Sequence, residues 1–340
     1  MVDRVFICEI SVSRELPAAP RPPGARLGGD MNIDLHQLEV FVAIARTRNV
    51  ARAADALDLT ASPVSRTLRT LEKSTGPLFQ RAHHDMQLTD RGEELLGAAV
   101  SVLQLAHVFE DRAAGVERTL RYGTTPWVPD SYTEAFRAAV GLSGISPVEY
   151  SHEVSVGLLD KLRFGEIDMA RVQLPLDPAV HPDISSLAIG RYSFDLMVAV
   201  DDPLVDIAAD GPVPLTALRG RHVVTLPFSK MQPTPGRKLR EWFSAAGVQD
   251  VAEVDFGDYA VLDSRLPRTH EVSIRARPAT PGDRHASSTK ITWLPVAGPQ
   301  PQFEIGAVWR TGATARREEI DRVVDALQQQ FAEPPVSPTP

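Results

Sequence analysis

Several features that define large classes of proteins are missing from this chain of 340 residues. Its single cysteine, Cys8, excludes a disulfide framework and a zinc site built from cysteines, and it fits a reducing cytoplasm. No apolar run is long enough to cross a bilayer, and the first residues lack the basic start and cleavage pattern of a secretory signal. We therefore expect a cytoplasmic protein with no membrane partner.

The chain also lacks a basic excess and the motifs of common enzymes. Its net charge is −8, so any contact with nucleic acid must come from a local patch. We find no glycine-rich phosphate loop, nucleophile elbow or metal-ligand spacing. His152 and Glu153 could form an acid–base pair, but neighbours on a strand point to opposite faces. We expect no enzymatic activity, no cofactor and no bound metal.

What is present is the composition of a soluble globular protein, with 43% hydrophobic and 24% charged residues. Both ends are different. Residues 1–30 include the Pro/Gly-rich run ELPAAPRPPGARLGGD, and residues 333–340 are also proline-rich, so we expect both segments to be disordered. Met31 directly precedes the first helical pattern, so residues 1–30 are either a flexible arm or precede the true start.

Residues 31–90 show the pattern of three short helices followed by two strand-like pieces. Apolar side chains recur at helical spacing in the first helix, at Leu35, Leu38, Phe41, Val42 and Ala45. Asn49 is placed to cap the second helix, VARAADAL. Thr60 is placed to cap the third helix, which runs to about Ser74 and stops at Gly76-Pro77. The strand-like pieces lie in LFQRAHHDMQL, around a turn.

The third helix, in DLTASPVSRTLRTLEK, has two distinct faces. Val64, Leu68 and Leu71 share one face, and the opposite face carries Ser62, Ser65, Arg66, Arg69 and Lys73. The only acid, Glu72, lies off that row, whereas an ordinary solvated helix would usually mix both charge signs there. Hydroxyls near a helix start and arginines along it suit phosphate and base-edge contacts. With the short turn before it, this helix completes a helix-turn-helix, whose second helix enters the major groove.

The following segment, residues 91–118, predicts a long helix from about Asp90 to Glu117, capped by Thr89. Its apolar side chains alternate in steps of four and three, which makes a narrow coiled-coil seam. The alternative is a helix packed on its own domain, but the length and the narrow stripe favour pairing with a second copy. The residues expected at this contact are Leu95, Ala99, Val102, Ala106 and Phe109.

From residue 119 to residue 332 the pattern alternates between strands and helices, which indicates α/β architecture with mostly parallel sheets. Ligands of two-lobed α/β domains bind between the lobes, near strand C-termini and helix N-termini. The stretches YGTTPW, EVSVGLL and VTLPFSK offer suitable side chains, namely Thr124, Thr125, Ser155, Thr225, Phe228 and Ser229. Each of these residues could equally be a plain helix cap.

Residues 35–96 resemble the winged helix-turn-helix of LysR-type transcriptional regulators. The resemblance rests on FVAIA, AADAL, SRTLRTLEKSTGPLFQR and LTDRGEEL, which stand in the order and spacing of that family. The next helix and the α/β segment fit the family's linker helix and effector domain in length and order. The resemblance implies an N-terminal all-α winged helix-turn-helix, a long linker helix and a C-terminal α/β, two-lobed, periplasmic-binding-protein-like effector domain.

The resemblance also implies a sequence-specific transcriptional regulator. It would bind double-stranded operator DNA as a homodimer or homotetramer and respond to a small-molecule effector, with RNA polymerase as a further candidate partner. The residues expected at the DNA are Asn49, Thr60, Ser62, Pro63, Ser65, Arg66, Arg69, Lys73, Arg81 and His84.

The chain departs from the family at three places. Ala61 stands where the family commonly has glutamine, so a groove-facing amide is lost. The wing, RAHHDMQ, has only Arg81 as a fixed cation, which weakens minor-groove anchoring. Its adjacent histidines, His83 and His84, could bind a metal, but histidines on a polar turn are more often just solvated.

The third departure is VLDSRLPRTHEVSIRARPATPGD, which stands where the family usually has a glycine-rich segment. This change indicates either a remodelled pocket, which we favour, or a regulator with a degenerate, ligand-independent effector domain. More remote alternatives for the α/β half are a solute-binding protein or an enzyme.

Overall fold

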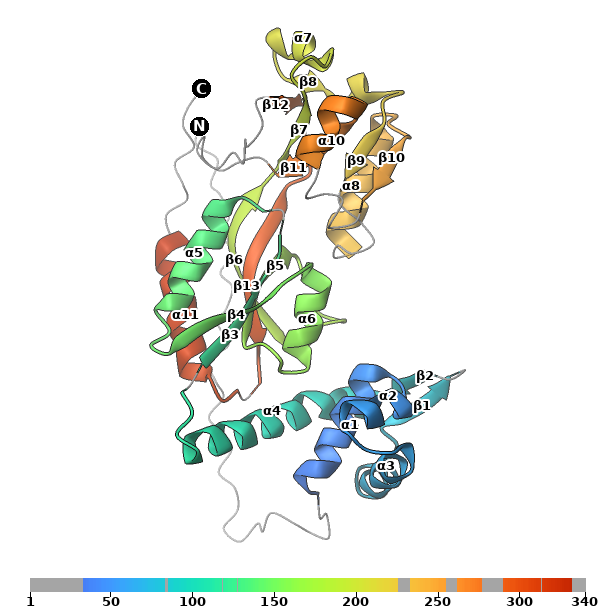
Figure 1. Cartoon of the computed structure of the whole chain (residues 1–340), viewed down its shortest axis with the longest axis vertical. Helices are drawn as coiled ribbons and strands as arrows, with labels where there is room; N and C mark the ends of the chain where they lie inside the picture. Colours follow the sequence, from blue (N-terminus) through green and yellow to red (C-terminus); the bar gives the residue numbers. More distant parts are fainter. Residues whose placement is uncertain are drawn as a thin grey trace, which may run out of the picture.

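The computed structural model describes residues 33–82, 85–117, 119–126, 128–225, 233–254, 262–276, 290–312 and 314–331. The end segments 1–30 and 333–340, and the candidate residues His84, Phe228 and Ser229, lie outside these ranges. A helical N-terminal domain is followed by a long helix, α4, and then by two sheets stacked end to end (Figure 1). In the described ranges, no helix has the length and apolar character that a membrane span requires.

The N-terminal domain has three helices and a hairpin, namely α1 (Leu35–Thr47), α2 (Val50–Ala56), α3 (Ala61–Thr75), β1 (Phe79–Ala82) and β2 (Asp85–Leu88). The hairpin is antiparallel, with Phe79 opposite Leu88. The three helices and the hairpin enclose one hydrophobic core, in which the Phe41 and Phe79 rings meet edge to face at 5.6 Å. The predicted three helices and two strands are therefore confirmed.

The buried face of α1 differs from the prediction by about a quarter turn. Leu35 was expected inside but is 44% exposed, whereas Val40 and Ile44 are fully buried. The reason is that α1 packs against α2, α3 and α4 together, and their combined position selects the face. A capping box between Asp34 and Gln37 fixes the start of the helix independently of that face.

Helix α4 (Asp90–Ala113) begins as predicted but ends earlier than the predicted Glu117. At its start, the Thr89 hydroxyl accepts the Gly92 N–H at 3.1 Å. At its end, Gly115 adopts a left-handed φ of +67°, and the Val116 N–H donates to the Asp111 carbonyl at 2.9 Å. This αL ending satisfies the last carbonyls and turns the chain away from the helix axis.

The first C-terminal sheet has the order β4 (Ser146–His152), β3 (Thr119–Thr124), β5 (Met169–Leu174), β13 (Phe303–Arg310) and β6 (Ile184–Tyr192). Its helices are α5 (Asp130–Gly141), α6 (Ser155–Arg163) and α11 (Arg317–Phe331). Helices α5 and α11 pack on each other, while α6 lies on β5, on the other side of the sheet (Figure 1). We call this layered unit the first lobe.

The second lobe contains the other sheet, with the order β10 (Val251–Glu253), β9 (Val223–Thr225), β11 (Val272–Ala276), β7 (Phe194–Ala199), β12 (Ile291–Ala297) and β8 (Val213–Pro214). Its helices are α7 (Leu204–Ala209), the 3₁₀ helix η1 (Leu215–Leu218), α8 (Pro233–Ala245) and α10 (Leu262–Thr269). One hydrophobic core runs through both lobes.

The prediction of mostly parallel sheets is confirmed only in part, because both sheets are mixed, with five parallel and four antiparallel pairings between their described strands. The chain crosses between the lobes twice, from β6 to β7 and from β12 to β13. In the first lobe, β13 runs antiparallel to β5 and β6. In the second lobe, β7 runs antiparallel to β11 and β12. Strands that enter from the neighbouring lobe oppose the βαβ strands, and an alternating sequence pattern does not reveal these crossings.

The contact of α4 with the hairpin yields a stability prediction. A Cβ atom on Gly92 would lie 2.3 Å from the Leu78 carbonyl oxygen and 2.8 Å from Leu88 Cδ2. We expect Gly92→Ala to lower the free energy of unfolding by about 1–3 kcal/mol, as overpacking typically does. Gly141→Ala is the matched control, because nothing lies within 4 Å of the added Cβ. Equal melting temperatures for the two variants in calorimetry would contradict this view of the contact.

Candidate functional site

The outer face of α3 carries the side chains that the sequence predicted for it. Val64, Leu68 and Leu71 are buried in the domain core, as expected. On the other face Ser65 is half-buried, and the exposed residues are Ser62, Pro63, Arg66, Arg69 and Lys73. None of the three cations forms an ion pair with another described residue. Their positive charge therefore faces solvent without a counterion from the described ranges.

The acid of α3 is turned away from this face. Glu72 Oε1 accepts the N–H of Leu78 at 2.9 Å and the N–H of Phe79 at 3.3 Å. The carboxylate thus holds the start of the hairpin against the end of α3. Because it is occupied there, the exposed cationic row is not neutralised by the helix itself.

The two predicted caps differ in their geometry. Asn49 Oδ1 accepts the N–H of Ala51 at 2.9 Å and of Arg52 at 3.1 Å, so the predicted cap of α2 is confirmed. Thr60 stands at the N-cap position of α3, but its side chain makes no capping hydrogen bond. Here the extended backbone at Thr60 starts the helix without the bond that we expected. The exposed hydroxyl group is left facing outward.

The base of the wing is held by a contact that the sequence did not reveal. Arg48, in a left-handed conformation at the end of α1, pairs with Asp85 of β2, and its carbonyl accepts the Met86 N–H at 2.9 Å. The hydrogen bond from Arg48 lowers the pKa of Asp85 below its usual value. Arg81 lies on β1 opposite Met86 in register.

Three of the candidate effector residues lie together in the first lobe. Thr124 ends β3, Thr125 follows it, Ser155 starts α6, and all three are almost fully buried. Between them, Arg171 donates to the Thr125 carbonyl at 2.5 Å, and the Gln173 N–H donates to the Ser155 hydroxyl at 3.0 Å. The β5 strand thus joins the end of β3 to the start of α6.

Thr225 forms its backbone hydrogen bond elsewhere, away from the three candidate residues of the first lobe. It ends β9 in the second lobe, it is fully buried, and its carbonyl accepts the Val254 N–H at 3.0 Å. Sequence reasoning also missed the buried Arg171, although one signal could have found it. It is the only charged side chain of MARVQL, the six residues of a strand that is buried throughout.

A polar network extends from Thr124 to the edge of the first lobe. The Thr124 hydroxyl donates to Glu149 Oε1 at 2.5 Å and lies 3.0 Å from His152 Nδ1, while Arg137 donates to Glu149 Oε2 at 2.7 Å. Burial lowers the pKa of His152, and the negative Glu149 opposes that shift. Glu153, the neighbour of His152, pairs with Lys161 at 2.7 Å.

The predicted α4 seam divides into a buried and an exposed part. Ala99 is 5% exposed and belongs to the core of the N-terminal domain, and Leu95 packs against that core. Val102 and Phe109 are 44% and 73% exposed. Leu105, which the prediction did not include, is 48% exposed on the same face. An apolar strip made of Val102, Leu105 and Phe109 is therefore left uncovered by the described part of the chain.

Comparison with known proteins identifies the class of the molecule. The family model described as "Bacterial regulatory helix-turn-helix protein, lysR family" matches residues 35–93, and the "LysR substrate binding domain" matches residues 147–332. The chain belongs to the LysR family of transcriptional regulators, with a DNA-binding helix-turn-helix domain and an effector-binding domain.

Relatives and solved structures agree with this assignment. A probable hydrogen peroxide-inducible genes activator from Mycobacterium avium is 28% identical over 288 residues, 81% of this chain and 88% of that protein. The regulator BudR from Raoultella terrigena is 27% identical over 51% of this chain, which spans only 58% of BudR. A full-length OxyR variant from Pseudomonas aeruginosa has the same fold, with a TM-score of 0.57 and 20% identity over 88% of this chain and 95% of that one. A full-length BenM variant has a TM-score of 0.51 and 20% identity, over 88% of this chain and 96% of the BenM chain.

The network around Thr124 predicts how His152 titrates. Since burial favours the neutral imidazole, its pKa in the folded chain lies below the unfolded value. The folded state then binds fewer protons than the unfolded state. His152 therefore contributes to stability at pH values above its unfolded pKa, and this contribution is lost as the pH falls from the unfolded pKa toward the folded one. Glu149→Gln removes the charge that favours the imidazolium and should lower the pKa further. An NMR titration that finds the pKa raised in this variant would contradict the network.

Proposed function

We propose that this regulator binds operator DNA as a homo-oligomer through the exposed face of α3, under the control of a small molecule held by its C-terminal domain. The observation that carries the proposal is the separation of charge on α3. Arg66, Arg69 and Lys73 face solvent without an ion-pair partner among the described residues, while Glu72 is engaged with the hairpin backbone. A helix kept cationic on one face suits a polyanion.

The proposed division of labour follows the order of side chains along α3. Thr60, Ser62, Pro63 and Ser65 lie at its start, where hydroxyl groups and helix N–H groups can reach phosphates. Arg66 comes next, where arginine can bind guanine with two hydrogen bonds. Residues 31–92 carry eight basic and seven acidic side chains, so affinity depends on this placement and on two copies acting together.

Two of the remaining proposed contacts, Arg69 and Lys73, lie further along α3. The others lie outside this helix. Asn49 uses its side-chain oxygen as a cap, which leaves its amide N–H groups to donate to a phosphate. Arg81 and His84 would extend the contact along the wing. Because Ala61 offers no amide at the helix start, the recognised site should differ somewhat from the sites of relatives with glutamine there.

A second copy of the chain is the proposed cover for the exposed strip of α4. Val102, Leu105 and Phe109 lie on the opposite face of α4 from Val100, Gln104 and His107, which face the first lobe. Such contiguous apolar surface usually marks an interface. Ala106 flanks the strip, whereas Ala99 is already buried within the chain and does not contribute to it.

The effector is proposed to bind where Thr124, Thr125 and Ser155 surround Arg171. The hydroxyls and the buried guanidinium would favour a small molecule that carries an anionic group. Thr225, Phe228 and Ser229 would contribute from the second lobe. This is consistent with the general position of ligands in two-lobed α/β domains, near strand C-termini.

A gel-shift assay with the DNA upstream of the protein's own gene tests the proposal. Arg66→Ala should weaken binding by about tenfold or more, as the loss of a base contact does. Arg112→Ala, an exposed arginine on α4, serves as the matched control and should bind like the wild type. Both variants should keep the wild-type oligomeric state. No shift by the folded wild-type oligomer at low salt would refute DNA binding, and unchanged binding by Arg66→Ala would refute its role.

Sedimentation velocity tests the proposed interface. Phe109→Asp places a charge on the most exposed side chain of the strip and should shift the chain from oligomer toward monomer, because an unpaired buried charge is costly. Val180→Asp introduces the same charge at a side chain that is 57% exposed in a loop of the first lobe, and it should remain oligomeric. If the Phe109→Asp chain sediments like this control, the strip is not the interface.

A further inference from the structure

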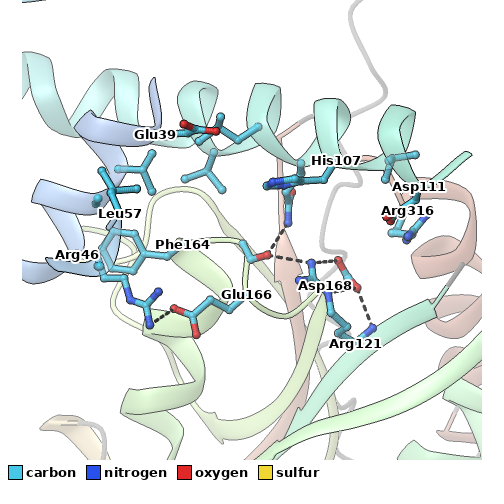
Figure 2. A pocket seen from close by; sticks show the side chains of 18 of the residues that line it. Glu39, Arg46, Leu57, His107, Asp111, Arg121, Phe164, Glu166, Asp168 and Arg316 are labelled. Carbon is cyan, nitrogen blue, oxygen red and sulfur yellow. Dashed lines mark hydrogen bonds and ion pairs between the residues drawn. The ribbon is translucent and has the colours of Figure 1, made fainter. Parts of the chain in front are cut away.

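One turn of the first lobe touches the DNA-binding domain of the same chain. We call this segment, residues 163–166 from the last residue of α6 toward β5, the junction turn. Glu166 Oε1 lies 2.9 Å from an Arg46 guanidinium nitrogen at the end of α1 (Figure 2). Arg163 pairs with Glu93 near the start of α4. The junction turn therefore bonds to two helices of the other domain through two ion pairs.

Glycine and phenylalanine bring the junction turn close to α4. Gly165 has a φ of +73°, and a Cβ atom there would lie 2.7 Å from Gln104 Nε2 and 2.8 Å from Val100 Cγ1. Its carbonyl accepts a hydrogen bond from Gln104 Nε2 at 3.0 Å. Phe164 packs against the hydrophobic core of the DNA-binding domain. Only glycine combines this backbone conformation with so close an approach.

The same segment is rigidly connected to the proposed effector residues. Helix α6 starts at Ser155 and ends at Arg163, a span of about 13 Å at ~1.5 Å per residue. Strand β5 leads back from the junction turn to Arg171 and Gln173. Between helix and strand lies a fully buried cluster, made of Leu158, Leu159, Leu162, Ile167, Ala170 and Val172. Close packing of this kind makes α6 and β5 move together.

A cavity of about 750 Å³ lies beside the junction turn, between α1, α4 and the first lobe (Figure 2). Apolar side chains such as Val42, Leu57 and Leu103 line it without filling it. Two of its arginines already have acidic partners, since Arg46 pairs with Glu166, and Arg121 pairs with an Asp168 oxygen at 3.3 Å. The cavity is thus a gap in the interface between the DNA-binding domain and the first lobe. Because this interface is not close-packed, the two domains can change their relative position at low cost in free energy.

We propose that the junction turn is the contact through which the effector-binding domain sets the position of its own DNA-binding domain. Movement at Ser155 would carry α6 and β5 as one body, and the junction turn would shift α1 and α4 into the cavity. Helix α3 would then change its orientation relative to the partner's copy. This inference rests on the proposed function, in which α3 reads DNA and the start of α6 lies at the effector.

Gly165→Ala in the full-length chain tests the inference, with Gly220→Ala as a matched control. Both glycines have nearly the same left-handed φ, +73° and +74°, but nothing lies within 4 Å of a Cβ at Gly220. Both variants therefore carry the same backbone strain, and only the first disturbs the junction. On the upstream DNA, Gly165→Ala should change affinity by about fivefold or more, the usual range of coupling between sites, and alter the DNase I footprint. Gly220→Ala should match the wild type.

A charge exchange provides a second test that does not depend on the glycine. Glu166→Arg opposes Arg46 and should alter affinity and footprint, and the double variant Arg46→Glu/Glu166→Arg should restore both relative to Arg46→Glu alone. If Gly165→Ala and Glu166→Arg both bind like Gly220→Ala, the inference is overturned. If the wild type binds no DNA, the proposed function fails instead. Hydrogen exchange of α1 then decides whether the junction itself forms, since Glu166→Arg should speed that exchange in free protein.

Discussion

Helix α4 has three faces with three different environments, and the arrangement of the described domains depends on it. Its first half completes the core of the DNA-binding domain through Leu96, Ala99 and Val100. A second face meets the first lobe, where the buried Arg310 guanidinium donates to the Ser101 hydroxyl at 2.7 Å. The third face carries the exposed apolar strip. One helix therefore fixes the DNA-binding domain, the effector-binding domain and the proposed partner relative to one another.

The DNA-binding domain shows how an acidic chain can present a cationic surface. The net charge of the protein is −8, yet the outer face of α3 carries three cations. Glu72 is used to hold the Leu78 and Phe79 N–H groups, and Asp85 is paired with Arg48. These two carboxylates are thus engaged in local structure. Charge balance over the domain matters less than the direction in which each group points.

The sequence was most informative where structure is local. Helix α3, the Asn49 cap and the short hairpin follow from periodicity and turn chemistry within a few residues. The sequence was less informative where elements that are distant along the chain determine which face is buried or which strand forms. The inward face of α1 depends on three other helices. Strands β6 and β12 were not predicted, because both have half-exposed positions that blur the strand pattern and β12 also contains Pro295. The Arg48–Asp85 pair and the junction turn join residues more than 35 positions apart, so no local pattern could indicate them.

The chemistry of the junction also explains why a modest signal would suffice to move it. Arg46 and Glu93 keep side chains that are 58% and 53% exposed, and solvent-exposed ion pairs typically contribute only about 0–1 kcal/mol each. A coupling free energy of about 1–3 kcal/mol, typical of allosteric proteins, is therefore enough to shift such contacts. A dry, close-packed joint would resist the same signal. The ion pairs specify where the two domains meet, and the unfilled cavity leaves them room to move.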